Sequence, residues 1–214
     1  MKYTKEEIYK LHQKHSAGEF TERYLELVWN HCNIVAEIAL QFVDKLIAEG
    51  MEVNKDLVIS GALIHDVGVY DCYDENLNKH KVEKYICHGT LGMQYVLDEG
   101  YDNKLARFCG YHTGVGITEE DIEKANLPLK NQNYIPVTLE EEIVAYADKF
   151  HTKWPKFVSF EEALEGLSEF GVDKVIILER FKMKFGVPDF SPLEEKYGKW
   201  QKEFDEYLNS ISKQ

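Results

Sequence analysis

The sequence has no long apolar run, no paired cysteine motif and no excess of positive charge. No apolar stretch reaches the roughly 18 to 20 residues that a helix needs to cross a bilayer, and segment 1–15 has no continuous apolar core of a secretion signal. The 4 cysteines show no CxxC spacing, so neither a zinc ribbon nor a disulfide framework is indicated. These absences predict a cytoplasmic protein that does not act within a membrane.

Acidic residues outnumber basic ones, 38 to 25, which gives a formal net charge of −13. Binding to extended nucleic acid depends on Lys and Arg that neutralise phosphates, so this charge argues against a nucleic-acid polymer as partner. A small phosphorylated substrate stays possible, because bound metal cations reverse the local field. Composition therefore leaves small-molecule chemistry open.

The pattern that is present is helical, and we predict an all-α protein in one domain over residues 1–214. Through 19–49, apolar residues recur at spacings of three and four: Leu25, Val28, Cys32, Val35, Ala39, Phe42 and Leu46. Four hydroxyl residues have a Glu three positions later, the spacing of a capping box: Thr4, Thr138, Ser159 and Ser191. No alternating strand pattern of useful length is present.

Two stretches, 69–86 and 126–137, lack helical periodicity and are predicted to be loops. They are either walls of a binding site or plain connections. The first has a basic segment, Lys79 to Lys84, that stands out in an acidic chain. Within it Lys81 is a candidate substrate-binding residue, and a solvated run of charge is the alternative.

One segment, 57–67 (LVISGALIHDV), is apolar on every face and therefore predicts a buried helix, yet it ends in His65 and Asp66. A buried carboxylate is normally paired, hydrogen-bonded or bound to metal. Similar positions, at an inner face or end of an apolar helix, hold four other residues: His31, His88, His112 and Asp148. Each could be a hydrogen-bonded core residue, or all could be ligands of Fe, Mn, Co, Ni or Zn.

The order of these residues resembles the H…HD…H…H…D pattern of HD-superfamily phosphohydrolases. The segment HDVG at 65–68 is similar to the HDIG variant, and AYADKFHTK at 145–153 resembles the region of the last aspartate. The likeness extends over about residues 30–153. One departure is Val69, where many HDIG members have Lys.

This resemblance implies an HD-type helical bundle with a metal-binding core over about 19–153 and a helical extension over about 156–214. It implies that His31, His65, Asp66 and Asp148 hold one divalent metal. Asp66 would bridge to a second metal held by His88 and His112, and these three residues would be catalytic.

The implied activity is hydrolysis of a phosphate ester or anhydride in a small nucleotide-like substrate. The spacing is also similar to that of bacterial hydrolases which split diadenosine tetraphosphate, so a dinucleoside polyphosphate is a candidate. Lys149, His151 and Lys153 follow the last aspartate and are candidate substrate-binding residues. For the two lysines, a solvated helix end is the alternative.

Three other functions remain open at this point. Some HD-fold proteins have a similar ligand set but use a di-iron centre to oxidise a small organic substrate. A nucleotide-binding sensor without turnover would keep the same ligands. A helical interaction domain with incidental histidines is the remaining alternative.

Overall fold

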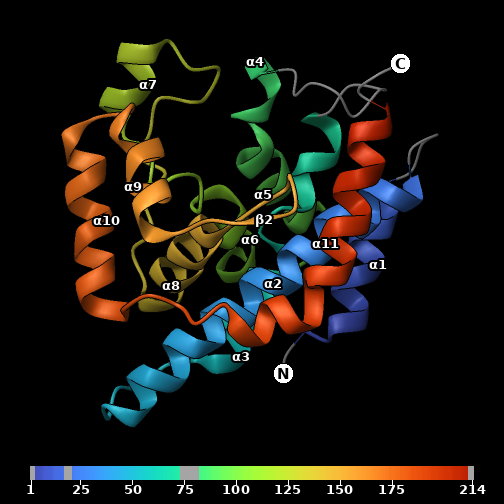
Figure 1. Cartoon of the computed structure of the whole chain (residues 1–214). Helices are drawn as coiled ribbons and strands as arrows, with labels where there is room; N and C mark the ends of the chain where they lie inside the picture. Colours follow the sequence, from blue (N-terminus) through green and yellow to red (C-terminus); the bar gives the residue numbers. More distant parts are fainter. Residues whose placement is uncertain (1–2, 17–20, 73–81, 212–214) are drawn as a thin grey trace.

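The computed structural model describes residues 3–16, 21–72 and 82–211, and it is built almost entirely from helices (Figure 1). Its helices are α1 (Lys5–His15), α2 (Thr21–Ala48), α3 (Lys55–Ile64), η1 (Val67–Cys72), α4 (Val82–Tyr85), α5 (His88–Asp98), α6 (Asn103–Gly110), α7 (Glu119–Ala125), α8 (Leu139–Ala147), η2 (Asp148–Phe150), α9 (Phe160–Ser168), α10 (Val172–Phe185) and α11 (Ser191–Ile211). The predicted all-α class is confirmed.

Side-chain caps fix the starts of six helices, α1, α3, α6, α7, α8 and α9. Thr4 and Ser159 form the predicted capping boxes, and the Thr138 hydroxyl accepts from the N–H of Glu141 at the start of α8. The prediction for Ser191 is wrong. Ser191 is itself the first residue of α11, and its N–H donates to the Asp189 side chain at 2.9 Å.

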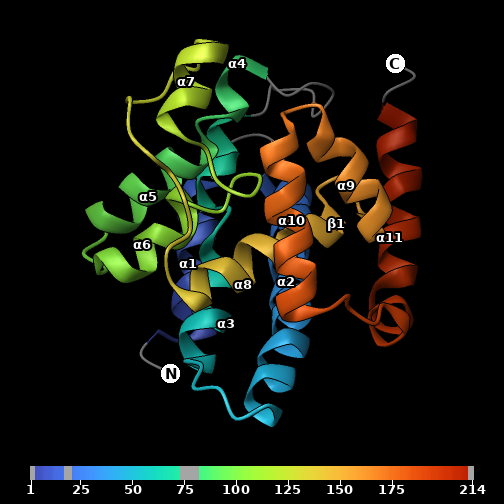
Figure 2. The same cartoon turned by 90° about the vertical axis from the view of Figure 1, so that its left-hand side faces the viewer.

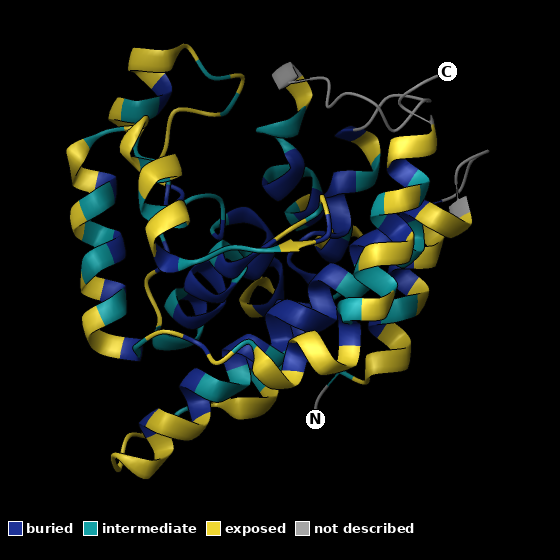
Figure 3. Ribbon diagram, in the orientation of Figure 1, coloured by how far each residue is buried: buried dark blue, intermediate teal, exposed yellow. Residues whose placement is uncertain are grey.

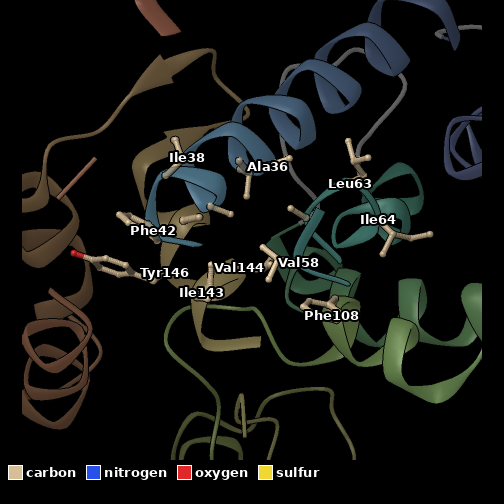
Figure 4. Packing of buried hydrophobic residues seen from close by; sticks show 14 of the residues in the cluster. Ala36, Ile38, Phe42, Val58, Leu63, Ile64, Phe108, Ile143, Val144 and Tyr146 are labelled. Carbon is tan, nitrogen blue, oxygen red and sulfur yellow. The ribbon is translucent and has the colours of Figure 1, made fainter. Parts of the chain in front are cut away.

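The long helix α2 runs through the middle of the molecule and packs against α3 and α8. Its predicted apolar stripe is buried apart from Leu25, and α3 is buried from Ser60 to Ile64, as its uniformly apolar sequence predicts (Figure 3). Figure 4 shows Phe42 of α2, Val58 of α3 and Val144 of α8 within one cluster of buried side chains. This core fixes the ends of α3 and α8 against the middle of α2.

The three helices after residue 156 lie on two sides of this core. Figure 1 shows α9 and α10 at the left and α11 at the right, and Figure 2 shows α11 at the edge opposite α5 and α6. Phe204 and Leu208 of α11 are buried against Tyr24 and Val28 of α2. The predicted division into a core and an extension stays a prediction.

The segment predicted as the first loop contains η1 and α4, and residues 73–81 between them, including Lys81, lie outside the described part of the chain. The second predicted loop is irregular, with a backbone bridge between Tyr134 and Ile117. Two short strands that the sequence did not predict, β1 (His151–Thr152) and β2 (Lys156–Phe157), pair antiparallel. Strands of two residues are too short for periodicity to reveal.

No helix within the described ranges combines the length and apolar character that a membrane span requires.

Gly68, in the HDVG segment, lies where η1 meets α5. A Cβ at this position would lie 2.1 Å from the carbonyl oxygen of His88 and 2.2 Å from the backbone nitrogen of Gly92. Both atoms belong to the backbone and cannot move without shifting α5. Gly68 therefore allows the close approach that brings His88 next to the end of α3.

We expect Gly68→Ala to destabilise the protein by about 3 kcal/mol, the upper end of the usual cost of overpacking, because α5 has to move. Gly166→Ala is the matched control, since a Cβ there has no atom within 4 Å and the position is helical. The control should be neutral or slightly stabilising. Urea denaturation measures both, and equal stability of the two variants would contradict this assignment.

Candidate metal centre

Six side chains from five segments meet at the ends and inner faces of the helices. His31 comes from the middle of α2, and His65 is the C-cap of α3, directly followed by Asp66. His88 is the first residue of α5, and Asp148 is the C-cap of α8. His112 lies two residues beyond the end of α6, so the predicted site residues are brought together.

The first cluster consists of His31, His65, Asp66 and Asp148. The Nε2 atom of His31 lies 3.0 Å from Oδ1 of Asp148 and 3.2 Å from Oδ2 of Asp66. The Nε2 atom of His65 lies 3.3 Å from the same two oxygens. All four donor atoms lie within 4.8 Å of one another, a separation that one metal ion can bridge.

The second cluster uses the other oxygen of Asp66. Its Oδ1 lies 3.4 Å from Nε2 of His88 and 3.5 Å from Nε2 of His112. The two imidazole nitrogens are 2.9 Å apart. Asp66 therefore lies between the clusters, with one carboxylate oxygen facing each.

Backbone carbonyls orient three of the four imidazoles. Nδ1 lies 2.7 Å from the Ala62 oxygen in His65, 2.6 Å from the Tyr85 oxygen in His88 and 2.7 Å from the Cys109 oxygen in His112. An N–H that donates to a carbonyl leaves the lone pair on Nε2, which is the arrangement of a metal-bound histidine. These three rings therefore direct an acceptor nitrogen into the centre.

Burial and charge set the protonation of the centre. Burial lowers the pKa of His88 to about 3 and also lowers the pKa of His112, so both rings are neutral, as metal ligands must be. Burial opposes ionisation of Asp66, but the charges of Lys153 and His65 hold its pKa well below the usual range. Burial disfavours the charged form of His65, but Asp66 outweighs it and raises the His65 pKa well above its usual value. The carboxylates thus favour a positive charge between them, at the Nε2 atom of His65, and either a proton or a metal cation can supply it.

The donor atoms fit a divalent metal. Both carboxylate oxygens of Asp66 and Nε2 of His65 are buried without a well-aligned hydrogen bond to the described residues, and the cation that pairs with Asp66 is the Lys153 ammonium, 2.6 Å from Oδ2. Such atoms are costly inside a protein unless a partner or a cation satisfies them. Imidazole nitrogen and carboxylate oxygen suit Mn, Fe, Co, Ni and Zn. The described residues thus contain two clusters able to hold metal, and they share Asp66.

Two lysines lie beside the carboxylates. The Lys149 ammonium is 2.7 Å from Oδ2 of Asp148, and the Lys153 ammonium is 2.6 Å from Oδ2 of Asp66. Lys153 also donates to the Tyr85 hydroxyl at 2.9 Å, and the Tyr85 ring stacks on His88. Sequence analysis missed this role of Tyr85, because the residue lay within a predicted loop.

His151 lies behind the first cluster. The chain is no longer helical there, since η2 ends at Phe150 and His151 begins β1. Its side chain is buried, and Nδ1 lies 2.9 Å from Nδ1 of His31. Its Nε2 lies 3.3 Å from Nε2 of Gln201 in α11. No motif marked Gln201, which is 50 residues farther along the chain.

The sequence profile of the HD domain matches residues 28–153, more than half of the chain and every residue of the two clusters. The chain belongs to the HD domain family. The resemblance seen in the H…HD…H…H…D pattern is thereby confirmed.

Three archaeal proteins resemble part of this chain. The uncharacterized protein MJ0778 of Methanocaldococcus jannaschii is 38% identical over 130 residues, which cover 60% of this chain and 69% of the relative. A tRNA (cytidine(56)-2'-O)-methyltransferase of Picrophilus torridus is 32% identical over 123 residues, covering 58% of this chain and 31% of that protein. The corresponding protein of Thermoplasma volcanium is 34% identical over 119 residues, covering 56% and 30%. The match thus spans less than a third of these methyltransferases.

Solved structures share the fold. The HD domain of the L. monocytogenes phosphodiesterase PgpH is similar with a TM-score of 0.51 and 16% identity, over 95% of this chain and 98% of that chain. Its complex with cyclic-di-AMP gives a TM-score of 0.50 and 15% identity, over 89% and 96%. At this identity the likeness shows the helical arrangement alone.

We expect Asp66→Asn to remove metal from both clusters, with a loss of affinity beyond the roughly 10- to 100-fold caused by losing an outer hydrogen-bond partner. Elemental analysis and chelator competition measure this. In EDTA the variant should be less stable than the parent, because Lys153 and His65 lose the buried carboxylate that pairs with them. Asp98→Asn, at an exposed position of α5, is the control. Unchanged metal content in Asp66→Asn would rule out a shared ligand.

Proposed function

We propose that this chain is a metal-dependent phosphohydrolase that cleaves a phosphate ester or anhydride in a small nucleotide-like substrate. The supporting observation is the position of Asp66 between two imidazole clusters, with Lys153 in contact with the same carboxylate. Cation-binding donors and an ammonium group at one place suit a phosphoryl group, which carries several negatively charged oxygens.

In this proposal one metal would be held by a first set of residues: His31, His65, Asp66 and Asp148. His88 and His112 would hold a second, with Asp66 as the shared ligand. Such metals, when bound, lower the pKa of a coordinated water and polarise phosphoryl oxygens. Asp66, His88 and His112 are accordingly the proposed catalytic residues.

Lys149 and Lys153 are the proposed phosphate-binding residues. Without metal, Lys149 neutralises Asp148 and Lys153 neutralises Asp66. If these carboxylates bound a metal ion, the two lysines would lose their partners. Their ammonium groups can then turn to phosphoryl oxygens within the same small volume. Tyr85 would hold the Lys153 side chain in place through its hydroxyl.

A nucleotide is the proposed substrate class. The similar PgpH HD domain is described as a phosphodiesterase and was solved with cyclic-di-AMP, so cyclic dinucleotides belong in the first set of compounds to test. The activity named for the archaeal methyltransferases is not proposed, because the matched part is less than a third of them and the net charge of −13 opposes binding to a polyanion.

The test is a screen of product release from nucleotides, cyclic dinucleotides and dinucleoside polyphosphates with each candidate divalent metal. We expect phosphate or nucleotide release that needs the metal, stops in EDTA and is absent in Asp66→Asn but retained in Asp98→Asn. Oxygen consumption by iron-loaded protein without phosphate release would instead support an oxygenase. Tight nucleotide binding without product under any metal would support a sensor.

We further expect Lys153→Gln to lower kcat/KM by about 10- to 100-fold, the loss of one charge-assisted hydrogen bond of roughly 1.5–3 kcal/mol, while metal content is retained. Lys149→Gln should behave in the same way. Lys156→Gln is the control, because this exposed side chain pairs with Glu162 at 2.6 Å. The same kcat/KM in Lys153→Gln and the control would contradict a phosphate-binding role.

A further inference from the structure

His31 differs from the other three histidines of the centre in what orients its ring. Its Nδ1 faces a side chain, Nδ1 of His151 at 2.9 Å, and not a backbone carbonyl. The Nε2 of His151 in turn lies 3.3 Å from the amide of Gln201. A line of three side chains thus connects the first cluster with α11, the C-terminal helix.

Metal binding by His31 would fix which group donates and which accepts in each hydrogen bond along this line. A neutral imidazole has one N–H and one acceptor nitrogen. His31 directs Nε2 at Asp66 and Asp148, so binding a cation there requires its N–H to be on Nδ1. That N–H donates to Nδ1 of His151, whose own N–H is then on Nε2 and needs an acceptor.

Gln201 can supply the acceptor. In the structure the amide nitrogen of Gln201 faces His151, and half a turn of the amide would put Oε1 there instead, since the oxygen and the nitrogen have nearly the same shape. With the amide nitrogen as donor, the order would reverse, and His151 would donate from Nδ1 to His31. His31 would then carry its N–H on Nε2, where it could not bind a cation.

α11 is held to α2 by contacts that do not involve Gln201. The Trp200 indole donates to Glu26 at 3.0 Å, and the Tyr197 hydroxyl donates to Glu37 at 2.5 Å. Phe204, one turn beyond, is buried against α2. A substitution at the half-buried Gln201 therefore leaves the helix anchored.

We propose that Gln201 is a positioning residue that fixes, through His151, the tautomer of His31 able to bind metal. The inference rests on the metal-binding part of the proposed function. Gln201 lies outside residues 28–153, so the family match assigns it no role. It also gives the C-terminal helix a part in the centre besides packing.

Three substitutions of Gln201 in the full chain test the polarity with Zn²⁺ alone as the probe. Gln201→Met keeps only the weak thioether acceptor, Gln201→Lys can only donate, and Gln201→Glu, as a carboxylate, can only accept. We expect Gln201→Met and Gln201→Lys to weaken the binding of one zinc equivalent by about 10-fold or more. We expect Gln201→Glu to keep the zinc affinity of the parent. Chelator competition measures the affinity.

Two substitutions at neighbouring positions of α11 serve as controls for the change in net charge. Lys202→Gln changes the net charge by −1, as Gln201→Glu does, and Glu203→Gln changes it by +1, as Gln201→Lys does; both control positions are exposed. Neither control should alter zinc affinity. Metal-free variants should unfold at the same urea concentration as the parent, which separates positioning from a structural role.

Nitrogen-15 NMR of histidine-labelled, zinc-loaded protein gives a second readout. We expect the His31 proton on Nδ1 in the parent and in Gln201→Glu. The inference would be overturned if Gln201→Met bound zinc as the parent does, or if Gln201→Lys kept the zinc affinity and Gln201→Glu lost it. Neither result would speak against the metal centre itself. A parent protein that binds no zinc or any other divalent metal would overturn the proposed function as well.

Discussion

The buried carboxylate of Asp66 is the constraint around which the molecule is arranged. Moving an ion of this kind out of water costs several kcal/mol, and a pair repays this only with good geometry. Its two oxygens have no well-aligned hydrogen bond to the described residues, and four imidazole nitrogens and a lysine surround them instead. A fold that keeps such a group is organised to bind a cation more than to maximise its stability.

Helix ends solve the problem of holding those imidazoles. The last carbonyls of a helix have no partner within it, and side-chain N–H groups can bond to them. His65 and His112 bond to Ala62 and Cys109 in the last turns of α3 and α6. The end of each helix thus sets both the place and the rotation of a ring. His31, in mid-helix, has no such carbonyl and depends on His151.

The sequence predicted the helical class, and the apolar helical setting marked out the six titratable side chains. Their division into two metal-binding sets came from the resemblance to the HD superfamily, and the structure brings the same six residues into two clusters. The sequence could not predict contacts between residues that only the folded chain brings together. Gly68 is recognised only once η1 and α5 are placed together, and Gln201 resembles any polar residue of an amphipathic helix. The capping pattern at Ser191 was misleading, because the side chain that accepts a backbone N–H at the start of α11 is Asp189 and the donor is the N–H of Ser191.

Local charge explains how an acidic chain could take up an anionic substrate. Two carboxylates of the centre are matched by two lysines, so the centre does not share the net charge of −13. Each cation bound by the carboxylates would leave the lysine charge uncompensated, and the local potential would become positive. Metal binding and attraction of phosphate are therefore coupled in the proposed function: the side chains that neutralise the metal-free protein are those that would contact the substrate.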